Sequence, residues 1–172
     1  STDRGDNWTK LMDMGNVATT VSAAPLNGNL VFAGTASATL IVHDGTTGYT
    51  HSAGTGTPDQ LPNRWITQVE ASPVDQNVVY VTYSGYGTGH VFKVTKTGAT
   101  WANVTVNDIS GNLPNIPVTS IQIDPNNSQL AWVGTDVGVF KTASADSRSM
   151  AASWFSVRGA MPIVAIMDLR FD

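Results

Sequence analysis

A repeat of about fifty residues organises this chain of 172 residues. Three prolines in similar surroundings mark the repeat, because Pro25, Pro73 and Pro125 lie 48 and 52 positions apart. A second marker, Leu-Pro-Asn or Met-Pro-Ile, recurs at 61–63, 113–115 and 161–163 with spacings of 52 and 48. A fixed period of roughly 20 to 50 residues is typical of proteins built from stacked structural units. The sequence therefore predicts a repeat architecture.

Each copy of the repeat predicts short strands separated by turns. Apolar strands are expected after the marker prolines at 30–35, 78–83 and 130–135, and further strands at 39–43, 90–95 and 138–142. Charged residues make up only 13% of the chain and Glu70 is its one glutamate, which disfavours helices. Four short strands per unit are typical of a β-propeller blade, with a β-sandwich as the alternative. The predicted fold class is all-β.

The repeat divides the chain into three full blades and two incomplete ends. The predicted blades span 17–62, 63–114 and 115–162, preceded by the end of a blade at 1–16 with a strand at 8–12, and followed by a first strand within 163–172. An ordinary closed ring has about 4 to 8 blades. We therefore expect self-association, a partner chain that completes the propeller, or a chain that is a fragment of a longer one, because exposed sheet edges favour pairing.

The first eight residues resemble the Asp-box, a motif written Ser-x-Asp-x-Gly-x-Thr-Trp. The match holds at Ser1, Asp3, Gly5 and Trp8, with Asn7 in place of threonine. A partial copy keeps Gly98 and Trp101, and a more degenerate one spans 142–154. The chain thus resembles the Asp-box (BNR-repeat) propellers of sialidases, sortilin-like receptors and family 74 xyloglucanases. The stretches 109–115 and 133–140 resemble repeats of large secreted bacterial proteins.

The resemblance implies a secreted or extracellular propeller in which the box is a structural turn. The aspartate of such a box accepts backbone N–H bonds, the glycine allows a positive φ, and the tryptophan fills the core. We therefore expect Trp8, Trp101 and Trp154 to be buried. Because boxes of this family generally lie away from ligands, the motif predicts fold and carries no catalytic assignment.

The first strands of the repeats align polar side chains in rows. These rows are Gln68, Ser120 and Asp168, then Glu70, Gln122 and Arg170, then Ser72, Asp124 and Asp172. First strands surround the central channel of a propeller, where ligands usually bind, so we predict that Glu70, Gln122 and Arg170 contact a ligand. The alternative is that these side chains pair between blades and keep the inner strands hydrated.

Aromatic residues near strand ends add a second set of ligand-binding candidates. Trp65, Tyr83 and Tyr86 are placed where an exposed ring stacks on a sugar, and the loop 83–89 is rich in glycine. The alternative is a hairpin that simply turns the chain.

Two kinds of glycoside hydrolase chemistry were compared with the residues present. Sialidase chemistry requires an arginine cluster, a tyrosine nucleophile and carboxylates, for which the available residues are Arg64, Arg158, Arg170, Tyr83, Tyr86 and Glu70. Xyloglucanase-type chemistry requires two carboxylates, for which Glu70, Asp124, Asp136 and Asp168 are available, although turn capping accounts for Asp124 and Asp136. Glu70, Asp168 and Arg170 remain as weak catalytic candidates.

The leading hypothesis is a non-catalytic extracellular module that serves as a scaffold or recognises glycan or protein, and the alternative is a fragment of a hydrolase. A net charge of −4 and a pI near 5.1, with no basic run, disfavour nucleic acid as a partner. No apolar stretch approaches the roughly 20 residues of a membrane span. Without cysteine, and with His43, His51 and His90 in no metal-binding spacing, we predict neither metal nor cofactor.

Overall fold

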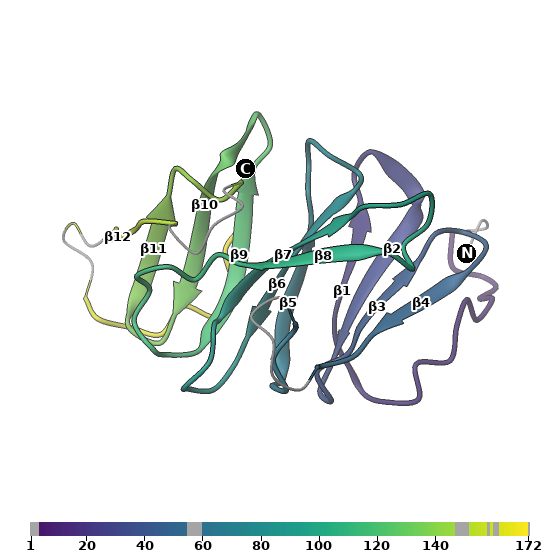
Figure 1. Ribbon diagram of the computed structural model, residues 1–172, viewed down its shortest axis with the longest axis horizontal. Coiled ribbons are helices and arrows are strands. Elements are labelled where there is room, and N and C mark those ends of the chain that lie inside the picture. Colours follow the sequence, from purple (N-terminus) through teal and green to yellow (C-terminus); the bar gives the residue numbers. More distant parts are fainter. Residues whose placement is uncertain (1–3, 55–59, 147–151, 158, 160–161, 172) are drawn as a thin grey trace.

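In a computed structural model the chain forms three four-stranded antiparallel sheets, which lie next to one another in chain order (Figure 1). The structure describes residues 4–54, 60–146, 152–157, 159 and 162–171. No helix occurs in these residues, and thus none with the length and hydrophobicity to cross a bilayer. The predicted all-β fold of propeller-like blades is confirmed.

Each sheet consists of four consecutive strands that pair in chain order. The first sheet contains β1 (Ala18–Ala24), β2 (Asn27–Thr35), β3 (Leu40–His43) and β4 (Gly48–His51). The second contains β5 (Ile66–Ala71), β6 (Val78–Tyr83), β7 (Val91–Lys96) and β8 (Val104–Asp108). The third contains β9 (Val118–Asp124), β10 (Asn127–Thr135), β11 (Gly138–Thr142) and β12 (Trp154–Ser156).

Strand positions follow the repeat closely, and the differences have a local cause. β6 and β11 have the expected bounds, whereas β2 and β10 begin three residues earlier than expected. The reason is that the turn residues already pair with the preceding strand, Asn27 opposite Ala24 and Asn127 opposite Asp124.

The two terminal strands expected at 8–12 and 164–171 are absent from the described structure. The later segment still runs beside the third sheet, because the Ile166 N–H donates to Thr135 O at 3.0 Å. That bond belongs to no continuous ladder, so the segment is not a strand. The earlier segment contacts the first sheet through side chains instead, with the Met12 sulfur against Gly48.

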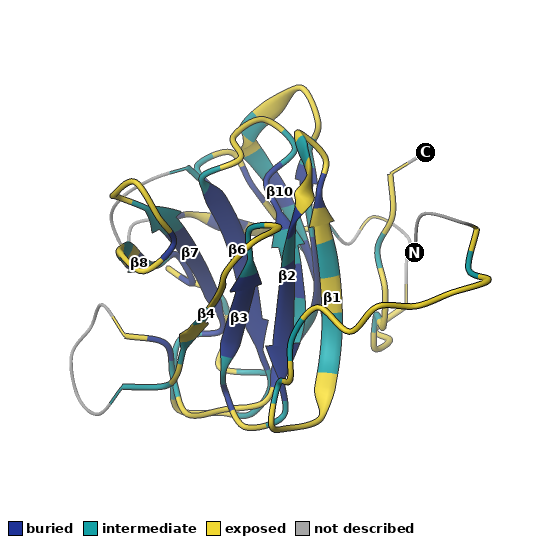
Figure 2. Cartoon of the chain, turned by 90° about the vertical axis from the view of Figure 1, so that its right-hand side faces the viewer, coloured by how far each residue is buried: buried dark blue, intermediate teal, exposed yellow. Residues whose placement is uncertain are grey.

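Two hydrophobic clusters hold the three sheets together. One lies between the first and second sheets and includes Phe32, Leu40 and Tyr83; the other lies between the second and third and includes Tyr80 and Ile121. Figure 2 shows the resulting burial of β2, β3, β6 and β7. Strands covered on both faces carry apolar residues at nearly every position, as in β6, where all six are buried.

The expectation of buried box tryptophans was wrong for Trp8. Trp101 is buried and packs edge-on against Phe32 at 5.0 Å between ring centroids, and Trp154 is buried with its indole N–H donating to Ile109 O at 2.9 Å. Trp8 is 80% exposed, and its ring lies over Gly5 of the same turn. Ser1 and Asp3 of the box lie outside the described residues.

The first strands of the sheets, β1, β5 and β9, are called the inner strands below, and a repeated contact joins them. The Thr19 hydroxyl donates to Ile66 O at 2.7 Å, and the Thr67 hydroxyl donates to Val118 O at 2.6 Å. The Thr119 hydroxyl donates to Ile166 O in the same way. The three threonines occupy the same repeat position, so each unit binds the next through one hydroxyl.

Candidate functional site

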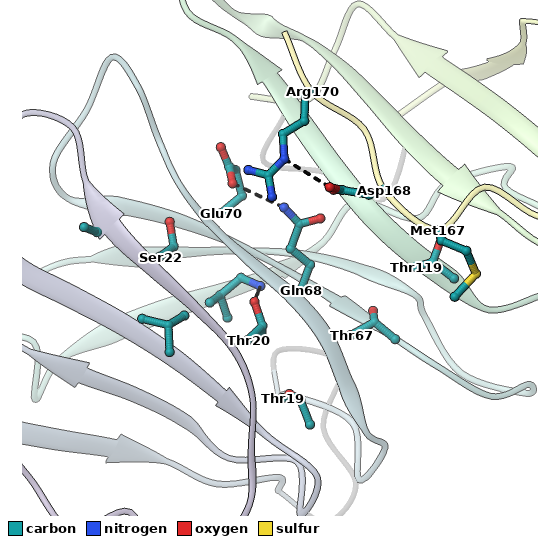
Figure 3. A pocket seen from close by; sticks show the side chains of 13 residues that line it. Thr19, Thr20, Ser22, Thr67, Gln68, Glu70, Thr119, Met167, Asp168 and Arg170 are labelled. Carbon is teal, nitrogen blue, oxygen red and sulfur yellow. Dashed lines mark hydrogen bonds and ion pairs between the residues drawn. The ribbon is translucent and has the colours of Figure 1, made fainter.

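The inner strands border a polar groove of about 450 Å³, called the inner-strand groove (Figure 3). β1 and β5 supply most of its lining, and β9 and the segment 167–170 complete it. Its lining residues with hydroxyl, amide or charged side chains are Thr19, Thr20, Ser22, Thr67, Gln68, Glu70, Thr119, Asp168 and Arg170. The groove therefore offers hydrogen-bond donors, acceptors and both signs of charge.

Side chains take the place of backbone pairing between neighbouring inner strands. Thr20 Oγ1 accepts from the Val69 N–H at 3.3 Å, and Gln68 Oε1 accepts from the Ile121 N–H at 2.7 Å. Ser22 Oγ likewise accepts from a backbone N–H of β5 at 3.1 Å. A side chain between two strands holds them farther apart than a direct ladder would, which leaves room for the groove.

Burial in the groove alters the acidity of Glu70. The carboxylate accepts a hydrogen bond from Gln68 Nε2 at 3.3 Å. Burial disfavours the charged form and raises the pKa of Glu70 to about 7, against the smaller lowering effects of the Gln68 bond and the Arg170 charge. The Asp168 charge adds slightly to the rise. Glu70 is therefore a carboxyl that changes its charge near neutral pH.

Arg170 and Asp168 form an exposed ion pair at the mouth of the groove. Arg170 Nε lies 3.1 Å from Asp168 Oδ2, and Asp168 Oδ1 accepts from the Leu169 N–H at 3.0 Å. Both charged side chains are largely exposed, so the pair contributes little to stability. Its position beside Glu70 is visible in Figure 3.

The structure brings four residues of the predicted rows together in the groove, Gln68 among them, and separates the others from them. Glu70, Asp168 and Arg170 line the groove, whereas Gln122 does not, and its amide donates to Ile121 O at 3.0 Å. Asp124 accepts from the Asn126 N–H at 2.8 Å, which is the expected turn cap. Arg158, which was considered for sialidase chemistry, and Asp172, the last member of the third row, lie outside the described residues.

The aromatic candidates lie away from the inner-strand groove. Trp65 and Tyr86 are 55% and 59% exposed, and Arg64 donates to the Tyr86 carbonyl at 3.5 Å in the same loop region. Tyr83 was wrongly expected at an exposed loop, because it ends a fully buried strand and its ring packs edge-on against Phe92 at 5.4 Å. Burial raises the pKa of Tyr83 well above its usual value, which disfavours a nucleophilic role.

Three polar groove residues on β1, namely Thr19, Thr20 and Ser22, were missed by the sequence reasoning. Thr20 and Ser22 lie 48 positions before Gln68 and Glu70 and occupy the same rows of the repeat. Extending the rows backwards by one unit would have found them. Within the described residues, no group of three His, Cys, Asp or Glu side chains is placed to hold a metal ion.

No family model and no curated protein matches the sequence. Two solved structures share the fold. An ancestral GH74 enzyme superimposes with a TM-score of 0.63 at 20% identity over 93% of this chain. The extracellular domain of a hybrid two-component system of B. thetaiotaomicron superimposes with a TM-score of 0.60 at 16% identity over 87% of this chain. The chain spans 21% and 20% of those structures, so the likeness shows a propeller-type fold alone.

Proposed function

We propose that the chain is a non-catalytic module of an extracellular β-propeller protein, and that its inner-strand groove recognises a glycan or a protein segment. The observation that carries this proposal is the groove lining, where hydroxyls, an amide, two carboxylates and a guanidinium gather from the inner strands and the segment 167–170. Such a set of groups suits a polar ligand that both donates and accepts hydrogen bonds. Likeness to an extracellular domain supports the proposed location.

We also propose that the repeats belong to the Asp-box type. Arg4 and Gly5 both have a positive φ, of 60° and 97°, which is the backbone that the box glycine is expected to allow. The partial copy places the buried Trp101 within a turn that is closed by the Thr97 N–H, which donates to Asn103 O at 3.0 Å. Both turns have the geometry of a structural element.

The contacts of the groove carboxylates favour binding over hydrolysis. A glycosidase requires one carboxyl that donates a proton and a second, available carboxylate across the sugar. Asp168 is already engaged by Arg170 and by the Leu169 N–H. No aromatic residue of the described structure lines the groove, so its contacts with a ligand would be polar ones.

A hydrolase fragment is the second candidate, and one observation favours it. The pKa of Glu70 is raised to about 7, which suits a general acid at neutral pH, and the Asp168 carboxylate lines the same groove. In this alternative Glu70 is the acid that protonates the leaving group, and Asp168 is the base on the opposite side of the sugar.

We further propose that the chain associates with itself or with a partner chain that completes the propeller. The support is an apolar hollow of about 300 Å³ on the outer face of the first sheet. Its apolar lining residues are Leu11, Met12, Met14, Val21, Val31, Ala33 and Ile41. Inside the molecule, the corresponding faces of the second and third sheets are covered by a neighbouring sheet.

Titration calorimetry with soluble glycans and peptides, paired with a reducing-end assay, tests the proposed function. We expect binding without hydrolysis, and a three- to tenfold weaker affinity for Arg170→Ala because a charged hydrogen-bond donor is lost, roughly 1 kcal/mol. Lys10→Ala, which removes an exposed ion pair that does not line the groove, is the matched control. Hydrolysis that Glu70→Gln abolishes would establish the enzyme alternative, and no binding by any ligand would contradict the proposal.

A further inference from the structure

A second cavity lies at the end of the second sheet, apart from the inner-strand groove. It measures about 350 Å³ and is lined by the β6–β7 hairpin, 87–90, and by the connection from β8 to β9, and it is called the hairpin cavity below. The lining residues on that connection are Asp108, Ser110, Gly111, Leu113 and Asn115. The two cavities share no lining residue.

Hydrogen bonds between hairpin and connection fix the walls of the hairpin cavity. Asn115 Oδ1 accepts from the Gly87 N–H at 2.6 Å and lies 3.2 Å from His90 Nε2. Ser110 Oγ accepts from the N–H groups of His90 and Val91 at 2.7 and 3.0 Å. The cavity is therefore a built feature of the fold, held by side chains from both segments.

Two buried polar atoms of the lining residues have no partner. His90 is only 2% exposed, and its Nδ1 makes no hydrogen bond. The Thr88 hydroxyl is likewise shielded from solvent and makes no hydrogen bond. Because Asn115 Oδ1 already accepts from Gly87, the His90 Nε2 atom donates to it, and Nδ1 is left without a hydrogen bond. A buried polar group without a partner lowers stability, so native structures seldom retain one without a reason.

The remaining groups define the chemistry that fits the hairpin cavity. Asp108 is its one charged lining residue, with one oxygen accepting from the Ser110 N–H at 2.8 Å. A cavity whose one charged lining group is a carboxylate, and which has no lining Lys or Arg, favours ligands that donate hydrogen bonds and repels anions. The exposed ring of Tyr86 immediately precedes the hairpin residues and offers a flat apolar face.

We propose that the hairpin cavity binds a neutral, hydroxyl-rich ligand, namely one sugar unit of a glycan. The volume lies at the small end of the roughly 300 to 1,000 Å³ that small-molecule sites occupy. The unpartnered atoms are shielded from solvent in the described structure, so binding includes a turn of the Thr88 side chain between staggered rotamers. The proposal does not rest on ligand binding in the inner-strand groove.

An NMR titration of the ¹⁵N-labelled protein with cellotetraose, xylotetraose and mannotetraose tests this assignment. We expect at least one sugar to shift the amide signals of Gly87 and Gly89 in a saturable way. Signals of Val69 and Ala71 report separately on the inner-strand groove. If only the signals of Val69 and Ala71 shift, the hairpin site is overturned and the groove proposal stands. If none of the three sugars shifts any signal, the hairpin site is overturned as well.

Two variants at Thr88 give a matched comparison. Thr88→Val keeps the shape of the side chain and removes the hydroxyl, so we expect the affinity for the bound sugar to fall about three- to tenfold. Thr88→Ser keeps the hydroxyl and retains the affinity. Equal affinities of the valine and serine variants would overturn the role of this hydroxyl, and unchanged amide spectra away from the cavity verify that both variants are folded.

Discussion

Glu70 shows how the groove changes the chemistry of a single carboxyl. Its burial between neighbouring inner strands raises its pKa to about 7 from the ordinary 4.5. Arg170 and Gln68 oppose this rise only in part, because Arg170 is directed to Asp168 and the Gln68 bond is long at 3.3 Å. The side chain therefore holds its proton in the folded state at a pH where the unfolded chain has lost it.

The stability of the protein should depend on pH through Glu70. Below about pH 4.5 both states hold the proton; as the pH rises from there to about 7, only the unfolded state releases it, so the free energy of unfolding falls. Glu70→Gln removes this contribution. Urea denaturation between pH 4 and 8 should show a flatter profile for the variant, with Asp136→Asn, at an exposed loop, as the control. An identical pH dependence in wild type and Glu70→Gln would contradict the assignment.

The packing of one element on the next depends on small residues at the joints between sheets. Gly34 on β2 faces the start of β5: a Cβ atom there would lie 2.9 Å from Thr20 Cγ2 and closer still to Ile66 Cγ2. Ile66 is fully buried and branched at Cβ, so it has little freedom to move aside.

Gly34→Ala should therefore lower the free energy of unfolding by about 1 to 3 kcal/mol through overpacking. Gly28→Ala is the matched control, because no atom lies within 4 Å of the Cβ that it adds. Both substitutions reduce the freedom of the unfolded chain equally, so their difference in thermal denaturation isolates the steric term. Equal melting temperatures would show that the joint tolerates a methyl group.

The threonine contact between inner strands makes a separate prediction. Thr67→Val removes the hydroxyl that donates to Val118 O and leaves that carbonyl without its partner, which should cost about 1 kcal/mol of stability. Thr105→Val, at an exposed position of β8, is the control and should change little. Chemical denaturation of the two variants measures the difference, and a neutral Thr67→Val would mean that the contact is incidental.

Much of the element order could be predicted because two independent markers, the turn prolines and the Leu-Pro-Asn type motif, show the same period. Strands that are buried on both faces, such as β6, were found through their apolar runs and proline turns. Trp8 and Tyr83 could not be placed, since their burial depends on which sheet covers them and not on their own motif. The glycines and aromatics of the loop 83–89 indicated this region, but neither Thr88 nor His90 was singled out for binding, because their significance lies in hydrogen bonds that they do not make.

In the whole molecule the three sheets follow one another along one direction, and only the middle one is covered on both faces by another sheet (Figure 1). The outer face of the first sheet instead contacts the segment 10–14, which leaves Val21 63% exposed. At the other end Phe171 packs edge-on against Trp132 at 5.0 Å. Apolar surface therefore remains at both ends of the described structure.

We expect this surface to drive concentration-dependent association. Sedimentation velocity should show species larger than 18.2 kDa as the concentration rises, and Val21→Lys should weaken their formation by placing a charge on the outer face of the first sheet. Val74→Lys, at an exposed turn residue, is the control. A single 18.2 kDa species at all concentrations would contradict self-association.

The threonine contact between inner strands also bears on how such a chain lengthens. In the second unit Thr67 donates forward to the third, while the carbonyl of Ile66 receives the hydroxyl of Thr19 from the first. Each unit thus encodes both halves of the joint within a few residues. A gene segment that is duplicated in tandem brings a new donor and a new acceptor together, so a unit is added or lost without new substitutions in its neighbours.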